Sequence, residues 1–230
     1  HNHIIMKKIV FTLFALALSM GSFAQLIADK TSNKVTANID LFTDFQLKTN
    51  ENWDPRGFNQ GFSAAITYNF PFNESNKHTI SIGLGISTHN YFSYSQILNP
   101  YNTDTLQFEQ WRGKENFKRY KVNPIYGEIP VELRFRIKDA VKIGVGFKFG
   151  VMLATRTRFV GPDIENEITK IDVKYLYIKN IERFAYAATF RIGYKFISAY
   201  CAYQFSRVFE DGHDAPAIFP LSVGITLAPF

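Results

Sequence analysis

Eight charged side chains recur at alternating positions in segments that are otherwise apolar. Acidic and basic groups spaced in this way can pair in a protein interior, line a polar channel, or surround a small polar ligand. Because a buried charge must be paired or else destabilises the fold, we expect a plug of ion pairs, with the channel and the ligand pocket as alternatives. The candidates are Glu128, Glu132, Arg134, Arg136, Lys142, Lys148, Arg191 and Lys195.

A serine and a histidine raise the question of hydrolytic chemistry. Ser87 and His89 are two residues apart, so they share one face of a strand and could belong to a small hydrolase or acyltransferase site. Without a further partner, this pair is too little for a catalytic triad. We therefore predict no catalytic residue and a non-enzymatic protein.

Metal-ligating residues are sparse. His213 lies among carboxylates in segment 210–214 and could present them to a divalent ion, but no second His or Cys accompanies it, so a solvated turn is expected. Cys201 is the single cysteine, which excludes an internal disulfide framework and any multi-cysteine metal site. Its expected role is packing. No metal and no cofactor is predicted.

The elements that must position these residues follow a period of two. In 35–47, apolar side chains alternate with polar ones such as Asp40, and this pattern indicates a β-strand with two unlike faces. Seven further segments have the same pattern, which predicts eight strands in all. The predicted strands span 35–47, 58–70, 78–95, 117–137, 141–159, 184–196, 197–209 and 219–227.

The connections between these strands alternate in length. Long connections follow the first, third, fifth and seventh strands, and short ones follow the second, fourth and sixth. This asymmetry is typical of an outer-membrane β-barrel with loops outside and turns in the periplasm. A charged side chain facing hydrocarbon costs roughly 2–4 kcal/mol, so the apolar faces should point outward. We predict an all-β, eight-stranded antiparallel up-and-down transmembrane β-barrel with both termini in the periplasm.

The beginning of the chain predicts export. Lys7 and Lys8 precede an apolar run at 9–20, and small residues follow, with cleavage expected between Ala24 and Gln25. Residues 1–24 are thus interpreted as upstream residues plus a signal peptide, and 25–230 as a single barrel domain. The mean hydropathy of −0.11 excludes a polytopic helical membrane protein.

Three of the strands resemble a known family. The segments 126–136 (YGEIPVELRFR), 144–150 (GVGFKFG) and 219–227 (FPLSVGITL) are similar to strands of the PorT-like outer-membrane β-barrel proteins of Bacteroidota. The resemblance implies the barrel fold and leaves the activity open, although the member that names the family belongs to a secretion apparatus. Phe230 departs from the pattern, because it is out of phase with the lipid-facing residues unless the chain kinks at Pro229.

The partners expected from the sequence are those of the cell envelope. The pI is near 9.3, but the basic residues are divided between the interior and the strand ends, so nucleic acid is not predicted. Segment 111–121 is basic and aromatic and could meet lipopolysaccharide phosphates or a partner protein, or form a solvated loop stem. The strands at 78–95, 117–137 and 141–159 exceed the 9–11 residues that a bilayer needs.

The excess length should rise above the membrane as a partly open sheet, and segment 173–179 would extend the strand at 184–196 in the same way. Because an open strand edge recruits partner strands, we expect surface recognition or a role as a subunit of an envelope assembly such as a secretion apparatus. The alternatives are a membrane-embedded hydrolase or acyltransferase and a narrow pore.

Overall fold

The computed structural model describes residues 34–49, 51–72, 77–101, 104–115, 117–137, 141–162, 170–212 and 214–228. The predicted signal segment with Ala24 and Gln25 lies outside these ranges, as do His213 and Phe230. No helix in the described ranges is long and apolar enough to cross a membrane.

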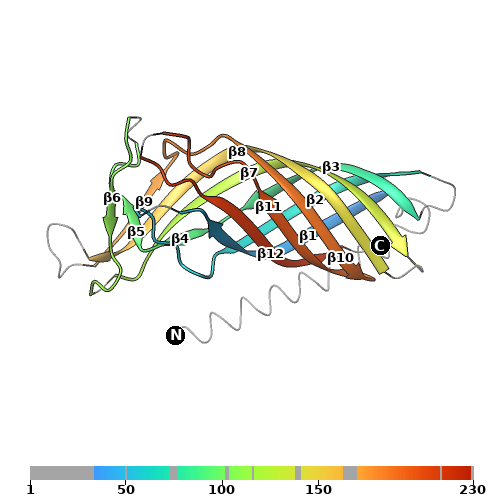
Figure 1. Cartoon of the computed structure of the whole chain (residues 1–230), viewed down its shortest axis with the longest axis horizontal. Helices are drawn as coiled ribbons and strands as arrows, with labels where there is room; N and C mark the ends of the chain where they lie inside the picture. Colours follow the sequence, from blue (N-terminus) through green and yellow to red (C-terminus); the bar gives the residue numbers. More distant parts are fainter. Residues whose placement is uncertain are drawn as a thin grey trace.

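Eight strands pair into a closed antiparallel ring (Figure 1). Each strand pairs with the next one in the ring, and β1 pairs with β12 from Ile39–Leu227 to Leu47–Phe219, which closes the barrel. This arrangement confirms the predicted fold class. The ring consists of β1 (Val35–Leu47), β2 (Gln60–Pro71), β3 (His78–Thr88), β7 (Arg119–Ile137), β8 (Val141–Pro162), β10 (Phe184–Tyr194), β11 (Ile197–Gln204) and β12 (Phe219–Leu227).

Four shorter strands gather at the end of the barrel where the connections are long (Figure 1). They are β4 (Tyr91–Ser93), β5 (Ser95–Ile97), β6 (Phe108–Gln110) and β9 (Lys170–Leu176). β4 pairs with the part of β7 nearest the long connections, which we call its upper part. β9 pairs with the corresponding upper part of β8, and β5 pairs with β6. The predicted extension at 173–179 is present in part: β9 ends at Leu176 and is a separate strand, which lies along β8 beyond the end of β10.

The predicted strand at 78–95 is interrupted. β3 and β4 keep one register along β7, from Thr88–Ile125 to Tyr91–Val122, but His89 and Asn90 between them are not in a strand. The residue opposite His89 in this register is Pro124, which has no N–H to donate to the ladder. The His89 amide still donates to the Pro124 carbonyl, at 3.2 Å, so the sheet continues past the gap.

The two faces of the ring differ in polarity as the alternation predicts. Outward side chains are large, apolar and exposed, with Leu84 at 72% and Ile66 at 65% of their full accessibility. Inward side chains are polar and buried, among them Asp40, Asp44 and Ser81. A water-soluble barrel would need the reverse. The exposed apolar belt and the polar interior define a transmembrane β-barrel of the outer-membrane type.

A β-bulge in β8 changes which side chains face outward in its upper half. Ile125 of β7 pairs with Ala154, but Tyr126 pairs with Met152, so Leu153 is an extra residue. Below the bulge the odd-numbered residues of β8 point outward, whereas above it the even-numbered residues do. Arg156 and Arg158 are thereby turned to the outer face, and Phe159 is turned into the interior.

We expect Leu84→Arg to destabilise the barrel by about 2–4 kcal/mol, because the new cation would face hydrocarbon near the middle of the span. The measurement is urea unfolding from lipid vesicles. Tyr177→Arg is the matched control, since Tyr177 is 68% exposed and lies outside the ring strands. Equal stability of the two variants would contradict the membrane placement of the belt.

Candidate functional site

Six charged side chains form a continuous network across the lumen. The Arg191 guanidinium contacts Asp40 Oδ2 at 2.9 Å and also bonds Glu132. Lys148 Nζ lies 3.1 Å from Glu128 Oε2 and 3.5 Å from Asp40 Oδ2. The sixth member is Arg134, whose Nε donates to Glu132 Oε1 at 2.6 Å. Acids and bases thus alternate along one chain of contacts, and three carboxylates neutralise three cations.

The other three predicted residues lie elsewhere. Arg136 and Lys142 face each other across β7 and β8 near the short-turn end, where both are half-buried. The lumen position predicted for Lys195 is wrong: it is exposed, with φ at 51°, in the two-residue turn between Tyr194 and Ile197. The predicted strand 184–196 ends at Tyr194, because the chain reverses there in a left-handed conformation that a strand residue does not adopt.

Asp40 is the network member that the sequence-based candidate set omitted. The residue is 2% exposed, and its carboxylate bridges Arg191 and Lys148 and accepts a 2.6 Å hydrogen bond from Thr226 Oγ1. The available signal was its position on the polar face of 35–47. The closure of the ring, which brings Asp40 on β1 opposite Thr226 on β12, cannot be read from the order of residues in the sequence.

A second buried cluster lies near the long-loop end of the lumen. Asp44 accepts a 2.6 Å hydrogen bond from Ser222 Oγ, and its other oxygen lies 2.8 Å from His89 Nδ1. His89 thus has an acid partner, but Ser222 bonds the acid and not the imidazole. Within the described ranges no hydrogen bond joins His89 to Ser87, whose Oγ is buried. The Ser87–His89 pair is therefore not assembled as a nucleophile and its base.

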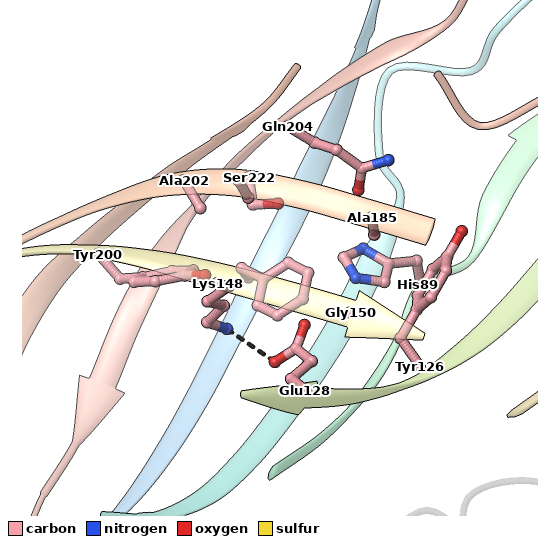
Figure 2. Close-up of a pocket in the computed structure, with 12 residues that line it drawn as sticks. His89, Tyr126, Glu128, Lys148, Gly150, Ala185, Tyr200, Ala202, Gln204 and Ser222 are labelled. Atoms are coloured by element: carbon pink, nitrogen blue, oxygen red, sulfur yellow. Dashed lines mark ion pairs between the residues drawn. The ribbon is translucent and has the colours of Figure 1, made fainter. Parts of the chain in front are cut away.

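The lumen between the two clusters leaves little free space. Figure 2 shows a cavity where Glu128 and Lys148 meet His89, Tyr126 and Tyr200. About 20 Å³ of it is open to the centre of a water molecule, which is room for about one or two waters. Ligand pockets for small molecules are on the order of 300–1,000 Å³. In the described part of the chain no group of three metal-ligating side chains is found.

At the long-loop end, the connections pack around a hydrophobic core above the barrel. We call this part of the structure the cap. All four long connections contribute to it, together with the upper parts of β7 and β8. Its buried members are Trp53, Tyr91, Ile97, Leu106, Trp111, Tyr120, Val122, Phe159, Ile178, Ile181, Val208, Phe209 and Ile218. The predicted basic and aromatic segment 111–121 is part of this structure, with Trp111 and Tyr120 buried.

Trp53 links the connections of the cap to one another. It is 2% exposed and makes edge-to-face contacts with Phe108, Tyr120 and Phe209, with ring centroids 5.5 to 6.4 Å apart. Its indole N–H donates to Gln46 Oε1 at 2.7 Å. Because these partners come from two other connections and from the ring strands β7 and β1, Trp53 fixes their relative positions.

Comparisons with known proteins give weak structural likenesses only. No family model and no curated protein matches the chain. The outer-membrane protease OmpT of Escherichia coli is 10% identical, with a TM-score of 0.43, and the alignment covers 87% of this chain and 98% of OmpT. Ail, the attachment invasion locus protein of Yersinia pestis, is 11% identical, with a TM-score of 0.36 and coverage of 85% and 96%. The barrel assignment rests on the strand pairing and the side-chain distribution.

We expect Arg191→Met to lower the free energy of unfolding by about 3–5 kcal/mol, because it leaves Asp40 and Glu132 with uncompensated buried charge. Arg207→Met is the control; it breaks an exposed pair with Asp211, which costs less than about 1 kcal/mol. Urea unfolding measures both. Planar-bilayer conductance should stay at background for the wild type. An unchanged stability together with an altered conductance would contradict the plug.

Proposed function

We propose that this barrel is a non-enzymatic outer-membrane protein that works through its cap, either in surface recognition or as a subunit of an envelope assembly such as a secretion apparatus. In this arrangement the cap is extracellular and both termini are periplasmic. The observation that carries the proposal is a cap with its own hydrophobic core and a strand, β9, that has one open edge among the described residues. The resemblance to PorT-like proteins of Bacteroidota supports the assembly role.

The open edge belongs to β9. On one side β9 pairs with β8 from Arg156–Leu176 to Pro162–Lys170, and in the described part of the chain no strand pairs with its other side. The Tyr177 amide donates to the Thr155 carbonyl at 2.7 Å, so Tyr177 and Thr155 form a hydrogen-bonded pair. Because bonded and non-bonded pairs alternate in antiparallel sheets, the N–H and C=O groups of Asp172, Lys174 and Leu176 point away from β8. They are available to a partner strand.

Exposed apolar side chains lie beside this edge. Leu176 is 55% exposed, Tyr177 is 68% exposed, and Tyr101, which contacts Tyr175 edge-to-face, is 55% exposed. The other strand at the end of the sheet, β4, has no such opening, because residues 54–56 hydrogen-bond along it. An open edge flanked by apolar side chains suits a partner that adds a strand and buries its own apolar residues.

The two alternative functions have less support. A narrow pore needs an open path, whereas the lumen contains a neutral network of six paired charges. A hydrolase needs a nucleophile beside its base, whereas Ser222 and His89 each bond Asp44 and not one another. The outer surface of the ring meets lipid, and we propose lipopolysaccharide as a further partner of the cap.

Site-specific labelling tests the orientation. Cys201 is first replaced by Ser, and a single cysteine is introduced by Tyr101→Cys in the cap or by Lys195→Cys in the β10–β11 turn. We expect a membrane-impermeant maleimide to label the first variant in intact cells and the second only after lysis. The opposite pattern would place the cap in the periplasm and remove the basis for surface recognition.

The mass of the particle purified from outer membranes in mild detergent tests the partner. We expect the wild type to carry a stoichiometric protein partner. Leu176→Pro should reduce the amount of bound partner at least tenfold, because proline removes an N–H group that points away from β8 and leaves the hydrogen bonds to β8 in place. Leu176→Ala keeps the N–H and should retain the partner. A wild-type particle of one chain alone would contradict the assembly role.

A further inference from the structure

The outer face of the cap sheet carries a row of basic side chains that continues across three strands. Lys121 of β7 pairs directly with Arg158 of β8, and Arg158 pairs directly with Lys174 of β9. Arg119 and Arg156 lie on the same face, two positions along their strands from the row. We call these five residues the basic face. Like charges placed opposite each other destabilise a sheet, so this arrangement needs a compensating partner.

The bulge in β8 creates the basic face. Without the extra residue Leu153, the alternation of β8 would place Thr155, Thr157 and Phe159 on the outer face, with Arg156 and Arg158 in the interior. With it, both arginines join Lys121 on the outside, and Phe159 packs in the cap core. One inserted residue therefore both completes the cap core and gathers the cations.

The described residues neutralise little of this charge. Among the described residues on this face of the three strands, Asp172 is the one carboxylate, and Arg158 Nε donates to it at 2.9 Å. Lys121 Nζ and Arg156 Nε are held by neutral acceptors, Asn90 Oδ1 at 2.7 Å and Asn123 Oδ1 at 2.6 Å. These amides orient the two cations without cancelling their charge.

The electrostatics agree with a crowded cationic surface. The pKa of Lys121 is lowered first by partial burial and then by the charges of Arg156, Arg119 and Arg158. The pKa of Asp172 is lowered chiefly by its hydrogen bond to Arg158, with further contributions from the charges of Lys174 and Arg119. Both shifts report cations close enough to interact, and a bound anion would relieve their mutual repulsion.

The height of the basic face identifies the anion that can reach it. A tilted strand climbs about 2.5 Å per residue along the barrel axis, so an apolar belt of about 25 Å takes about ten residues, 127–137 in β7. Lys121 then lies about 15 Å above the hydrocarbon, whereas phospholipid headgroups extend only about 5–8 Å. Phosphates carried on a saccharide extend further, as those of lipopolysaccharide do.

We propose that the basic face binds the phosphate groups on the saccharide of lipopolysaccharide. The site consists of Lys121, Arg158 and Lys174 as a row across the sheet, with Arg119 and Arg156 beside it. Arginine and lysine supply charge-assisted hydrogen bonds to phosphate oxygens. The face is continuous with the lipid-facing surface of β7 and β8, so a neighbouring lipopolysaccharide molecule presents its saccharide to it. The biological role of this site rests on the proposed extracellular position of the cap.

The test measures binding of the phosphorylated core oligosaccharide of lipopolysaccharide to the folded barrel in phosphatidylcholine nanodiscs, by calorimetric titration. The patch variant combines Lys121→Gln, Arg156→Gln and Lys174→Gln, each of which keeps a side-chain hydrogen-bond donor. The control variant removes the same charge outside the patch, through Lys48→Gln, Lys179→Gln and Arg207→Gln. Heat-dependent migration in gel electrophoresis verifies that both variants are folded.

We expect the patch variant to bind about 100-fold more weakly than the wild type, since each basic residue near an anionic surface contributes roughly a factor of five. The control variant should stay within about threefold of the wild type, and phosphatase treatment of the oligosaccharide should weaken wild-type binding at least tenfold.

Three results would overturn the proposal: an unchanged affinity of the patch variant, equal losses in patch and control variants, or competition by phosphatidylglycerol included in the nanodisc. The first result would mean that these residues do not bind the oligosaccharide, and the second that binding depends only on the net charge of the protein. The third would mean that the site binds lipid headgroups. Neither the protein partner nor the orientation in cells affects this measurement, so its outcome is separable from that of the proposed function.

Discussion

Hydrocarbon offers no hydrogen-bonding partner, and the whole structure follows from that constraint. Backbone groups inside a bilayer must be satisfied by the protein, so the ring closes through β1 and β12 and leaves no open edge at membrane depth. Closure with eight strands leaves an interior that side chains fill. Charges on the inward faces can then be kept only as mutually compensating groups. The alternating network from Arg134 through Arg191 and Asp40 to Glu128 meets this requirement.

Above the membrane the constraint is lifted, and a different core takes over. The cap is stabilised by burial of aromatic and aliphatic side chains around Trp53, as in a water-soluble domain. Its strands no longer need to close into a ring, and among the described strands β9 has one edge without a partner. The part of the molecule that water surrounds is thus also the part with unused hydrogen-bonding capacity, which is why we assign function to the cap and not to the lumen.

The edge and the outer face of β9 offer two kinds of recognition from one element. The edge presents backbone groups to a partner strand, and the face presents Lys174 in line with Arg158 and Lys121 to an anion. A lipopolysaccharide molecule bound to the face and a protein bound to the edge would then lie side by side, the first at Lys174 and the second at Leu176. The basic face would then position the surrounding lipid around the site where a partner docks.

The amino-acid sequence by itself determined the strand period, the number of ring strands, the alternation of long and short connections and the sidedness of each face. These properties are local, because side-chain direction alternates along a strand whatever its neighbours are. It also predicted that Glu128, Glu132, Arg134, Lys148 and Arg191 share an interior. It did not predict that Asp40 bridges the network, since the residues of β1 and β12 meet only when the ring closes.

The tertiary structure alone decided the remaining features, because each depends on pairing between strands. The turn at Lys195 ends a strand whose pattern continues through Phe196, and Pro124 interrupts β3 from the opposite strand. The bulge at Leu153 is the strongest case, since one unpaired residue exchanges the two faces of β8. The alternation of residue types along one strand does not reveal an inserted residue. The insertion becomes evident only from the register of the partner strand. For that reason the basic face of the cap was invisible in the sequence.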